Sequence, residues 1–277
     1  MAISQAAKAA AFKALHQQPG AFLLPNPWNA GTAKILAAAG FQALATTSAG
    51  LAFCLGQPDG VGAISREETL QNMRSIVEAT DLPVSADLEN CFADEPQACA
   101  AVIKQAAQIG LAGGSIEDAT GCRDDPIYPF ALAVERVAVA VQAAGALPYP
   151  FVLTARAENL MWGRPDLRDT IKRLEAFAAA GADVLYAPGL RTLEEVDAVV
   201  RAVAPKPVNV VVGVTETILS IAELSALGVK RISLGSTLAR TALGAFIRAI
   251  REMKENGTFQ FATQAISEAT IVEMFDR

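Results

Sequence analysis

Histidine, cysteine motifs and long apolar segments are what this 277-residue sequence has least of. His16 is the only histidine, and its position in an alanine-rich stretch near the start argues against a Ser/His/Asp hydrolase. The four cysteines show no CxxC spacing, so neither a zinc knuckle nor a disulfide framework is expected. This cysteine usage favours a reducing cytoplasm.

A membrane-spanning run and an excess of positive charge are also missing. Mean hydropathy is high at +0.31, yet no segment reaches the roughly 18 uncharged apolar residues that a membrane helix needs. The first 20 residues contain no continuous apolar stretch, so we do not expect a signal peptide. The 23 Lys and Arg against 29 Asp and Glu give a net charge of −6, which argues against a nucleic-acid-binding face.

What the sequence does contain is a regular alternation of short apolar runs and helical stretches. The predicted strands are 21–25, 43–47, 83–87, 112–116, 151–155, 183–187, 207–211 and 231–235. The predicted helices are 30–40, 66–80, 95–110, 132–145, 168–181, 193–203 and 217–228. Several of these helices end at a glycine just before the next strand, as helices commonly do.

Eight strand–helix units in about 250 residues predict an α/β fold, a (β/α)8 TIM barrel. The strands look apolar rather than alternating, which is typical of a parallel sheet buried on both faces. A doubly wound open sheet is the alternative, but no G-x-G-x-x-G follows the first strand. No linker or change in composition divides the chain, so one domain is expected over 1–277, with the tail 257–277 helical and outside the barrel.

Acidic residues follow the predicted strands at the end where barrel enzymes keep their active sites. Asp59 lies in the loop after the second strand, Asp87 and Glu89 follow the third, Glu117 the fourth, and Arg156 the fifth. Crowded carboxylates must either protonate or bind a cation. Because no histidine or cysteine accompanies them, the ligand set favours Mg²⁺ first and Mn²⁺ second. Any single acid could instead cap a helix or pair with an arginine.

Two other barrel chemistries can be weighed from the same strand ends. A Schiff-base aldolase needs a lysine inside the barrel, but Lys206 and Lys230 precede strands and so belong to the opposite end. Gly213 and Gly235 follow the last two strands and resemble a glycine-lined phosphate cradle. The simpler explanation for these glycines is that a small residue lets the next helix start close to its strand. The expected electron sink is therefore a metal.

Four segments resemble the isocitrate lyase/phosphoenolpyruvate mutase superfamily. They read PNPWNAGTAKILAAAGFQALATTSAGLAFCLGQPD, PVSADLEN, GGSIEDAT and VLTARAE, and the resemblance extends from about residue 20 to 250. It implies a (β/α)8 barrel, Mg²⁺, a small 2-oxo or 2-hydroxy acid as substrate, and a reaction through an enolate-like pyruvate species. It also implies a homotetramer in which the eighth helix is exchanged between partners.

The resemblance also implies roles for particular residues. Ser48, with the backbone around Ala49 and Gly50, would hold the substrate carboxylate. Asp87 would bind the metal directly, and Asp59 would lie in its outer shell near the reacting group.

Three further residues complete the predicted metal and substrate site. Glu89 stands where the superfamily has its second aspartate, one methylene longer than that residue. Glu117 would bind metal-ligated water, and Arg156 would stabilise the developing enolate or carboxylate charge.

The loop 118–132 departs from both well-described branches of the superfamily. The lyases carry a K-R-C-G-H loop with a general-acid cysteine, but Asp125 occupies that position and Cys122 lies three residues short. The mutases and phosphonopyruvate hydrolases use Lys and Asn where this chain has Arg123 and Asp125, so Arg123 becomes the predicted substrate contact. Pro188 replaces their polar group on the sixth strand. The loop is irregular and long enough to close as a lid.

Together with the resemblance, these residues predict a Mg²⁺-dependent carbon–carbon lyase or decarboxylase that cleaves a small 2-oxo or 2-hydroxy (di)carboxylate through a pyruvate enolate. A C–P bond hydrolase or mutase acting on phosphonopyruvate is the alternative, because it would share every metal residue. A non-catalytic or phosphate-binding barrel is the further alternative. No nucleic-acid or membrane partner is expected.

Overall fold

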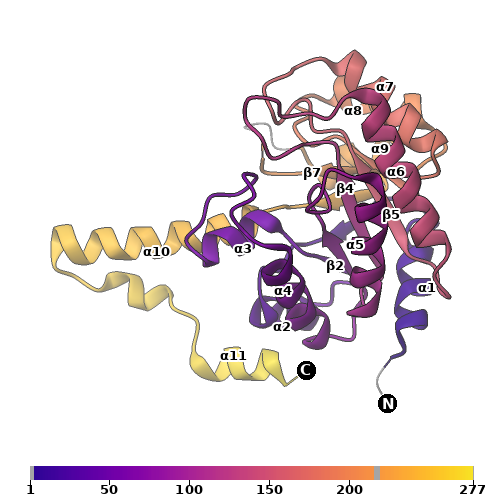
Figure 1. The fold of residues 1–277 in the computed structure, drawn as a ribbon. Helices are drawn as coiled ribbons and strands as arrows, with labels where there is room; N and C mark the ends of the chain where they lie inside the picture. Colours follow the sequence, from indigo (N-terminus) through magenta and orange to yellow (C-terminus); the bar gives the residue numbers. More distant parts are fainter. Residues whose placement is uncertain (1–2, 215–218, 277) are drawn as a thin grey trace.

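The computed structural model describes residues 3–214 and 219–276, and within them eight parallel strands form one barrel (Figure 1). The strands are β1 (Phe22–Leu24), β2 (Leu44–Ala45), β3 (Val84–Asp87), β4 (Gly113–Glu117), β5 (Val152–Arg156), β6 (Val184–Tyr186), β7 (Val208–Val211) and β8 (Arg231–Ser233). Each of β2 to β7 pairs with the next strand along the chain, and β8 returns to β1. The Ala45 N–H donates to the Pro25 carbonyl at 3.0 Å across the remaining seam. The predicted barrel is confirmed.

Helices alternate with the strands and cover the outside of the barrel. They are α1 (Gln5–Leu15), α2 (Ala30–Ala38), α3 (Ser48–Cys54), α4 (Arg66–Glu78), α5 (Pro96–Gln108), α6 (Phe130–Gly145), α7 (Leu167–Ala179), α8 (Leu193–Val203), α9 (Ile221–Ala226), α10 (Thr237–Asn256) and α11 (Glu268–Phe275), with a 3-10 turn η1 (Gln260–Gln264). Capping boxes start α2, α4, α8 and α9, because the N-cap side chain and the third helical residue satisfy each other's backbone N–H groups. The predicted helix 217–228 begins at residues outside the described ranges. Within the rest of that prediction, the structure has α9.

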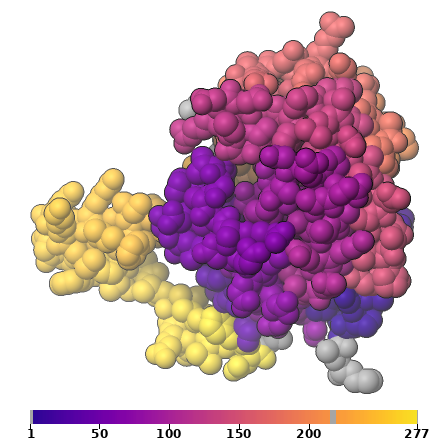
Figure 2. All heavy atoms as spheres, in the orientation of Figure 1, coloured from indigo at the N-terminus to yellow at the C-terminus, as the bar shows by residue number. Residues whose placement is uncertain are grey.

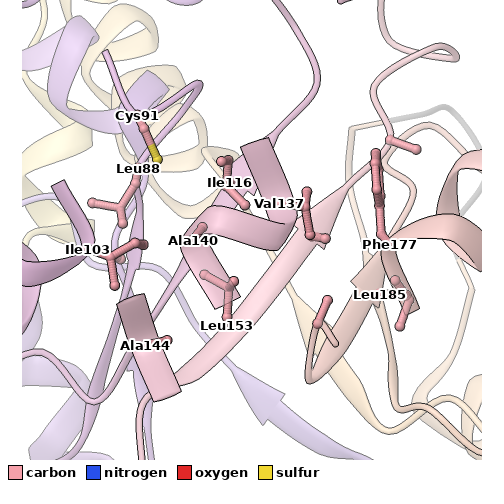
Figure 3. Packing of buried hydrophobic residues seen from close by; sticks show 14 of the residues in the cluster. Leu88, Cys91, Ile103, Ile116, Val137, Ala140, Ala144, Leu153, Phe177 and Leu185 are labelled. Carbon is pink, nitrogen blue, oxygen red and sulfur yellow. The ribbon is translucent and has the colours of Figure 1, made fainter. Parts of the chain in front are cut away.

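The larger hydrophobic core lies between the strands and the surrounding helices. Figure 3 shows Ile103 of α5, Ile116 of β4, Ala140 of α6 and Leu153 of β5 packed together, and all four are fully buried. Ile116 and Leu153 point outward from their strands. The apolar residues that make the strands recognisable in the sequence therefore belong to this outer layer.

The inner face of the barrel is polar, which differs from the uniformly apolar strands expected. Ser115, Thr154, Asn209, Arg231 and Ser233 are all buried and alternate with apolar neighbours along their strands. Both faces of the sheet are buried, as predicted. On the inner face, however, hydroxyl, amide and guanidinium groups form hydrogen bonds with one another. The polar interior continues into the site described below.

Helix α1 closes the amino-terminal end of the barrel. Phe12 is fully buried against strand starts that include Val152 and Val184, and its ring lies edge-on to that of His16 at a centroid distance of 4.9 Å. Burial lowers the pKa of His16 to about 3. The ammonium group of Lys206 donates to the Ala182 carbonyl at 2.7 Å, so this lysine lies at the end opposite the acids.

The carboxyl-terminal segment leaves the body of the molecule. Helix α10 extends away from the barrel, and α11 returns beside α2 (Figures 1 and 2). The Lys34 ammonium group holds α11 by donating to the Phe275 carbonyl at 3.0 Å. Large apolar side chains along α10 are exposed, among them Leu243, Phe246 and Ile250. None of the helices in the described ranges has the length and apolar character needed to cross a membrane.

Candidate active site

A cavity of about 170 Å³ opens at the carboxyl ends of the strands, and residues from β1 to β8 or the loops that follow them contribute to its wall. This volume is below the 300–1,000 Å³ of pockets for drug-sized ligands, so a small substrate fits best. Ser48, Ala49, Asp59, Asp87 and Arg156 line it, as the sequence analysis predicts for the site. Among the described residues that line this cavity there is no lysine, which agrees with the exclusion of imine chemistry.

Asp87, the last residue of β3, lies between two elements that orient its carboxylate. One oxygen accepts from the Ser48 hydroxyl at 3.0 Å and the Ser48 N–H at 3.3 Å, at the start of α3. The other accepts from Arg156 Nη1 at 2.7 Å. Gly50 is buried beside these residues without lining the cavity, and a Cβ there would lie 2.6 Å from the Thr47 side chain. Gly50 therefore lets α3 approach closely.

Arg156, the last residue of β5, is ion-paired with three carboxylates. Besides the contact with Asp87, its Nη2 lies 3.2 Å from Glu117 and its Nε lies 2.8 Å from Glu158. The guanidinium carbon also lies 5.1 Å from the centre of the Tyr186 ring. Burial alone would lower the pKa of Arg156, but the three acids raise it well above its usual value. This arginine is a fixed positive charge at the cavity wall.

The site holds more negative charge than this one arginine can balance. Burial, with the charge of Asp87 adding to it, raises the pKa of Glu89 to about 8. Burial also raises the pKa of Glu117 well above its usual value, and Asp59, although exposed at the rim, has its pKa raised by the surrounding protein and by Asp87. Carboxylates in this situation either hold protons or take up a cation.

The chemistry of these donors fits a hard divalent cation bound partly through water. In the ranges 3–214 and 219–276, no three acidic, histidine or cysteine side chains converge closely enough to enclose an ion by themselves. Mg²⁺ usually keeps several waters and takes only one or two carboxylates from the protein. Asp87 as the direct ligand, with Asp59, Glu89 and Glu117 reached through water, matches that pattern.

The backbone after Asp87 is strained in a way that the sequence does not reveal. Glu89, Cys91 and Phe92 all have φ between 48° and 59°, although none is glycine. Each such residue costs about 1–3 kcal/mol and persists only when its surroundings enforce it. Arg136 of α6 supplies that enforcement, because its guanidinium donates to the carbonyls of Asn90, Ala93 and Asp94 at 2.5 to 2.6 Å. Arg136 thereby holds the segment just after Glu89, whose own carbonyl accepts from the Glu117 N–H at 3.0 Å.

The loop 118–132 keeps its predicted functional residues away from the cavity. Arg123, Cys122 and Asp125 are exposed, and none of them lines the cavity. The side chain of Asp125 forms a 3.8 Å ion pair with Arg164 at the surface. The structure therefore does not bring Arg123 to the other predicted substrate contacts, and closure of this loop as a lid stays a prediction.

The backbone donors of the suggested phosphate cradle are already engaged. The N–H groups of Leu234 and Gly235 both donate to the Asn26 Oδ1 atom at 2.9 Å. At Gly213 a Cβ would lie 2.5 Å from the Thr237 hydroxyl, so close packing explains this glycine. These contacts favour the simpler explanation for the glycines.

Tyr186 and Arg231 are among the cavity residues that sequence reasoning missed. Tyr186 ends β6, and burial raises the pKa of its phenol; a polar residue closing an apolar strand was the available signal. Arg231 begins β8 and is buried, yet its long side chain reaches the cavity from below. The first residue of a strand normally lies at the opposite end of a barrel from the active site. The one sequence signal for Arg231 was that a charged residue begins an otherwise apolar strand.

The fold and the mouth of the barrel together define a TIM-barrel enzyme. Residues 12–254 match the family described as phosphoenolpyruvate phosphomutase. A Mycobacterium tuberculosis protein of uncharacterised function is 34% identical over 248 residues, covering 88% of this chain and 89% of the relative. The chain belongs to the phosphoenolpyruvate phosphomutase family, within the isocitrate lyase/phosphoenolpyruvate mutase superfamily.

Similar proteins in this family are described as lyases and mutases. "Probable 2-methylisocitrate lyase 1" of Corynebacterium glutamicum is 28% identical, covering 90% of this chain and 82% of the relative. A solved structure from Burkholderia cenocepacia J2315, described as a lyase/mutase, is 57% identical with a TM-score of 0.95, covering 99% of this chain and 97% of that one. Membership of the superfamily, expected from the four sequence segments, is confirmed.

Proposed function

We propose that this enzyme is a Mg²⁺-dependent lyase or decarboxylase that cleaves a carbon–carbon bond in a small 2-oxo or 2-hydroxy (di)carboxylate. The observation that carries this proposal is the surplus of carboxylates around Asp87, which Arg156 alone does not neutralise. Mn²⁺ would serve in place of Mg²⁺, since it accepts the same oxygen ligands.

The metal ligands we propose are Asp87 directly and Asp59, Glu89 and Glu117 through water. When bound there, the cation would supply Lewis-acid withdrawal of electrons from the substrate's C2 oxygen. The start of α3, with Ser48 and the backbone around Ala49, would hold the substrate carboxylate next to it.

The remaining residues of the cavity would handle charge and protons. Arg156 presents a fixed positive charge where the enolate develops, and such preorganised charge contributes several kcal/mol to catalysis. Asp59 lies at the rim with a raised pKa, so it can exchange a proton with the reacting group. Tyr186 keeps its proton because its pKa is raised, so it is a second candidate proton donor.

Cleavage of a C–P bond in phosphonopyruvate is the second candidate, and the name of the matching family favours it. The metal residues would be shared, so the substrate group beyond C2 decides between the two. We place carbon–carbon cleavage first because a similar protein is named "Probable 2-methylisocitrate lyase 1" and Pro188 offers no polar group to a phosphonate. Release of inorganic phosphate from phosphonopyruvate would reverse this order for hydrolysis.

We also propose a homotetramer in the cytoplasm. The apolar side chains of α10, including Phe246 and Ile250, are exposed on a helix that leaves its own barrel, so the matching helix surface of a second copy would be their natural cover. All four cysteines are free, as expected where thiols stay reduced. Sedimentation analysis of the wild type and of Phe246→Asp tests the assembly, and a wild-type monomer would contradict it.

The central experiment is a screen of 2-oxo and 2-hydroxy acids, with and without Mg²⁺, for release of pyruvate or carbon dioxide. Asp87→Ala should abolish any activity found, whereas Asp125→Ala, at an exposed acid outside the cavity, should not change it. Calorimetry with Mg²⁺ or Mn²⁺ in the presence of oxalate provides an independent readout. No uptake of either metal would contradict the proposal.

A further inference from the structure

The mouth of the cavity has a charged side and an uncharged side. Ser48, Asp59 and Asp87 come from β2, β3 or the loops that follow them, and Arg156 ends β5. The described residues that line the cavity at the carboxyl ends of β6, β7 and β8 are uncharged. Because β6 and β7 lie opposite β2 and β3 in an eight-stranded barrel, a ligand held on the charged side faces the uncharged side.

Four apolar side chains lie together on or next to the uncharged side, and we call them the apolar wall. They are Met161 in the loop after β5, Pro188 after β6, Val211 at the end of β7 and Val214 just beyond it. Because β5, β6 and β7 pair with one another in that order, these residues follow one another around the cavity mouth.

The packing around two glycines shows how closely the apolar wall is built. A Cβ at Gly189, in the loop after β6, would lie 3.4 Å from the Met161 Sδ atom, so this thioether rests on the backbone of that loop. A Cβ at Gly235 would lie 3.5 Å from Val211 Cγ2 and 3.9 Å from Val214 Cγ1, so both valines lie beside the start of α10. The apolar wall therefore extends from the loop after β5 to the loop after β8.

Met161 is the part of the apolar wall that water still reaches. It is 47% exposed, whereas Val211 is 9% exposed. Covering an exposed thioether with an apolar group removes both surfaces from water and is favourable. A carboxylate placed against the same side chains would instead lose hydration without gaining a hydrogen bond, which costs free energy. The apolar wall therefore favours an alkyl group over a charged one.

Polar groups that line the same side of the cavity are already hydrogen-bonded within the protein. Asn209 Nδ2 donates to Ser233 Oγ at 3.0 Å, and Asn209 Oδ1 accepts from Arg231 Nε at 2.8 Å. The Nη1 atom of Arg231 is shielded from solvent. Two backbone N–H groups just before α10 donate to Asn26 Oδ1. These donors are therefore not available to a second anionic group of a ligand.

We propose that the apolar wall binds an uncharged alkyl group of the substrate, so that the substrate is a 2-oxo or 2-hydroxy monocarboxylate with no second carboxylate or phosphonate beyond C3. The inference rests on the proposed function for the end that carries C1 and C2. The cavity volume of about 170 Å³ agrees, because a cavity of about 150 Å³ holds benzene and this one is open at its mouth. Met161 and Val211 would then be specificity residues.

The test compares two 2-hydroxy acids of the same shape and handedness by calorimetry in Mg²⁺. They are 2-hydroxy-4-methylpentanoate and malate, in which a carboxylate takes the place of the isopropyl group. The wild-type protein should bind the alkyl acid about tenfold more tightly, the size expected from burying two methyl groups. A preference of less than about threefold, or a preference for malate, would overturn the inference.

Two variants of Met161 test the apolar wall directly, and both should fold because this side chain is exposed. Met161→Gln, with a polar side chain of nearly the same length, should reduce the preference by about threefold. Met161→Lys, with a positive charge, should move the preference toward malate by about tenfold. Ile221→Lys is the matched control, because Ile221 is 50% exposed outside the cavity wall, and it should change nothing. An unchanged preference in both Met161 variants would overturn the inference.

The same measurements separate this inference from the proposed function. If oxalate binds with Mg²⁺ but malate binds as tightly as the alkyl acid, the role of the apolar wall is wrong and the lyase proposal stands. If oxalate and Mg²⁺ do not bind, the lyase proposal fails. In that case 4-methylpentanoate and succinate, which have the same shape, are compared without metal. A preference for 4-methylpentanoate that shrinks in Met161→Gln supports the inference, and no preference overturns it.

Discussion

The two ends of the barrel solve opposite problems with the same eight strands. At the amino-terminal end, Phe12 and His16 close the barrel with edge-on rings, and Lys206 satisfies a free carbonyl. At the carboxyl-terminal end, acids crowd around Arg156 and the backbone after Asp87 is strained. The closed end therefore contributes stability, whereas the open end keeps unfavourable charge and strain that a ligand can relieve.

Arg156→Gln should give the largest effect at the open end. Its loss removes the fixed charge at the cavity wall, so kcat/KM should fall by about 10²–10³-fold. The metal-free variant should also lose stability at pH 7.5 and recover at pH 5, because the acids around it then hold protons. Steady-state kinetics and urea denaturation at the two pH values measure both effects. Activity within tenfold of the wild type would contradict the proposed role.

Phe12→Ala should give the converse result at the closed end. Removing this buried ring should reduce the free energy of unfolding by about 3–5 kcal/mol, with kcat/KM of the folded enzyme unchanged. Ile221→Ala, at an exposed apolar residue, is the control and should change stability by less than about 0.5 kcal/mol. A drop in kcat/KM as large as that of Arg156→Gln would show that the two ends of the barrel are not independent.

Magnesium affinity should depend on pH through Glu89. Since the pKa of Glu89 is raised to about 8, the metal must displace its proton, and affinity should rise by up to roughly tenfold per pH unit from pH 6 to 8. The metal-free protein should show the opposite trend: the stability due to this raised pKa is present below pH 4.5 and is lost as the pH rises through about 8. Calorimetric titrations and denaturation curves measure the two slopes.

Glu89→Gln is the control for both slopes and should flatten each of them. Glu117 also has a raised pKa, so some dependence on pH should persist in the variant. Identical slopes in the wild type and Glu89→Gln would remove Glu89 from the metal site.

His16 should make the protein lose stability in acid. Its pKa is about 3 in the fold and about 6.5 when unfolded, so its contribution is present above pH 6.5 and is lost as the pH falls toward 3. Because it is the only histidine, NMR can follow its ring directly. A ring that titrates near pH 6 would show that this end of the barrel is open to water.

Much of the fold could be predicted because the apolar outer residues of the strands and the glycines that follow several helices are local signals. The meeting of Asp87, Glu117 and Arg156 at strand ends could also be predicted, since strand ends converge in a barrel. The contacts of Arg136 and Arg231 could not be predicted, because each depends on a long side chain reaching across elements distant in sequence. The polar inner face of the barrel could not be predicted either, because only single polar residues interrupt the apolar run of each strand.

The polar lining of the barrel separates selection for stability of the fold from selection for substrate specificity. Since the fold depends mainly on the layer between strands and helices, residues such as Ser115, Asn209 and Ser233 can change without dismantling the scaffold. A new substrate could then evolve by exchanging a few inward-facing side chains. Enzymes that share this scaffold could therefore diverge in specificity while their outer helices stay nearly constant.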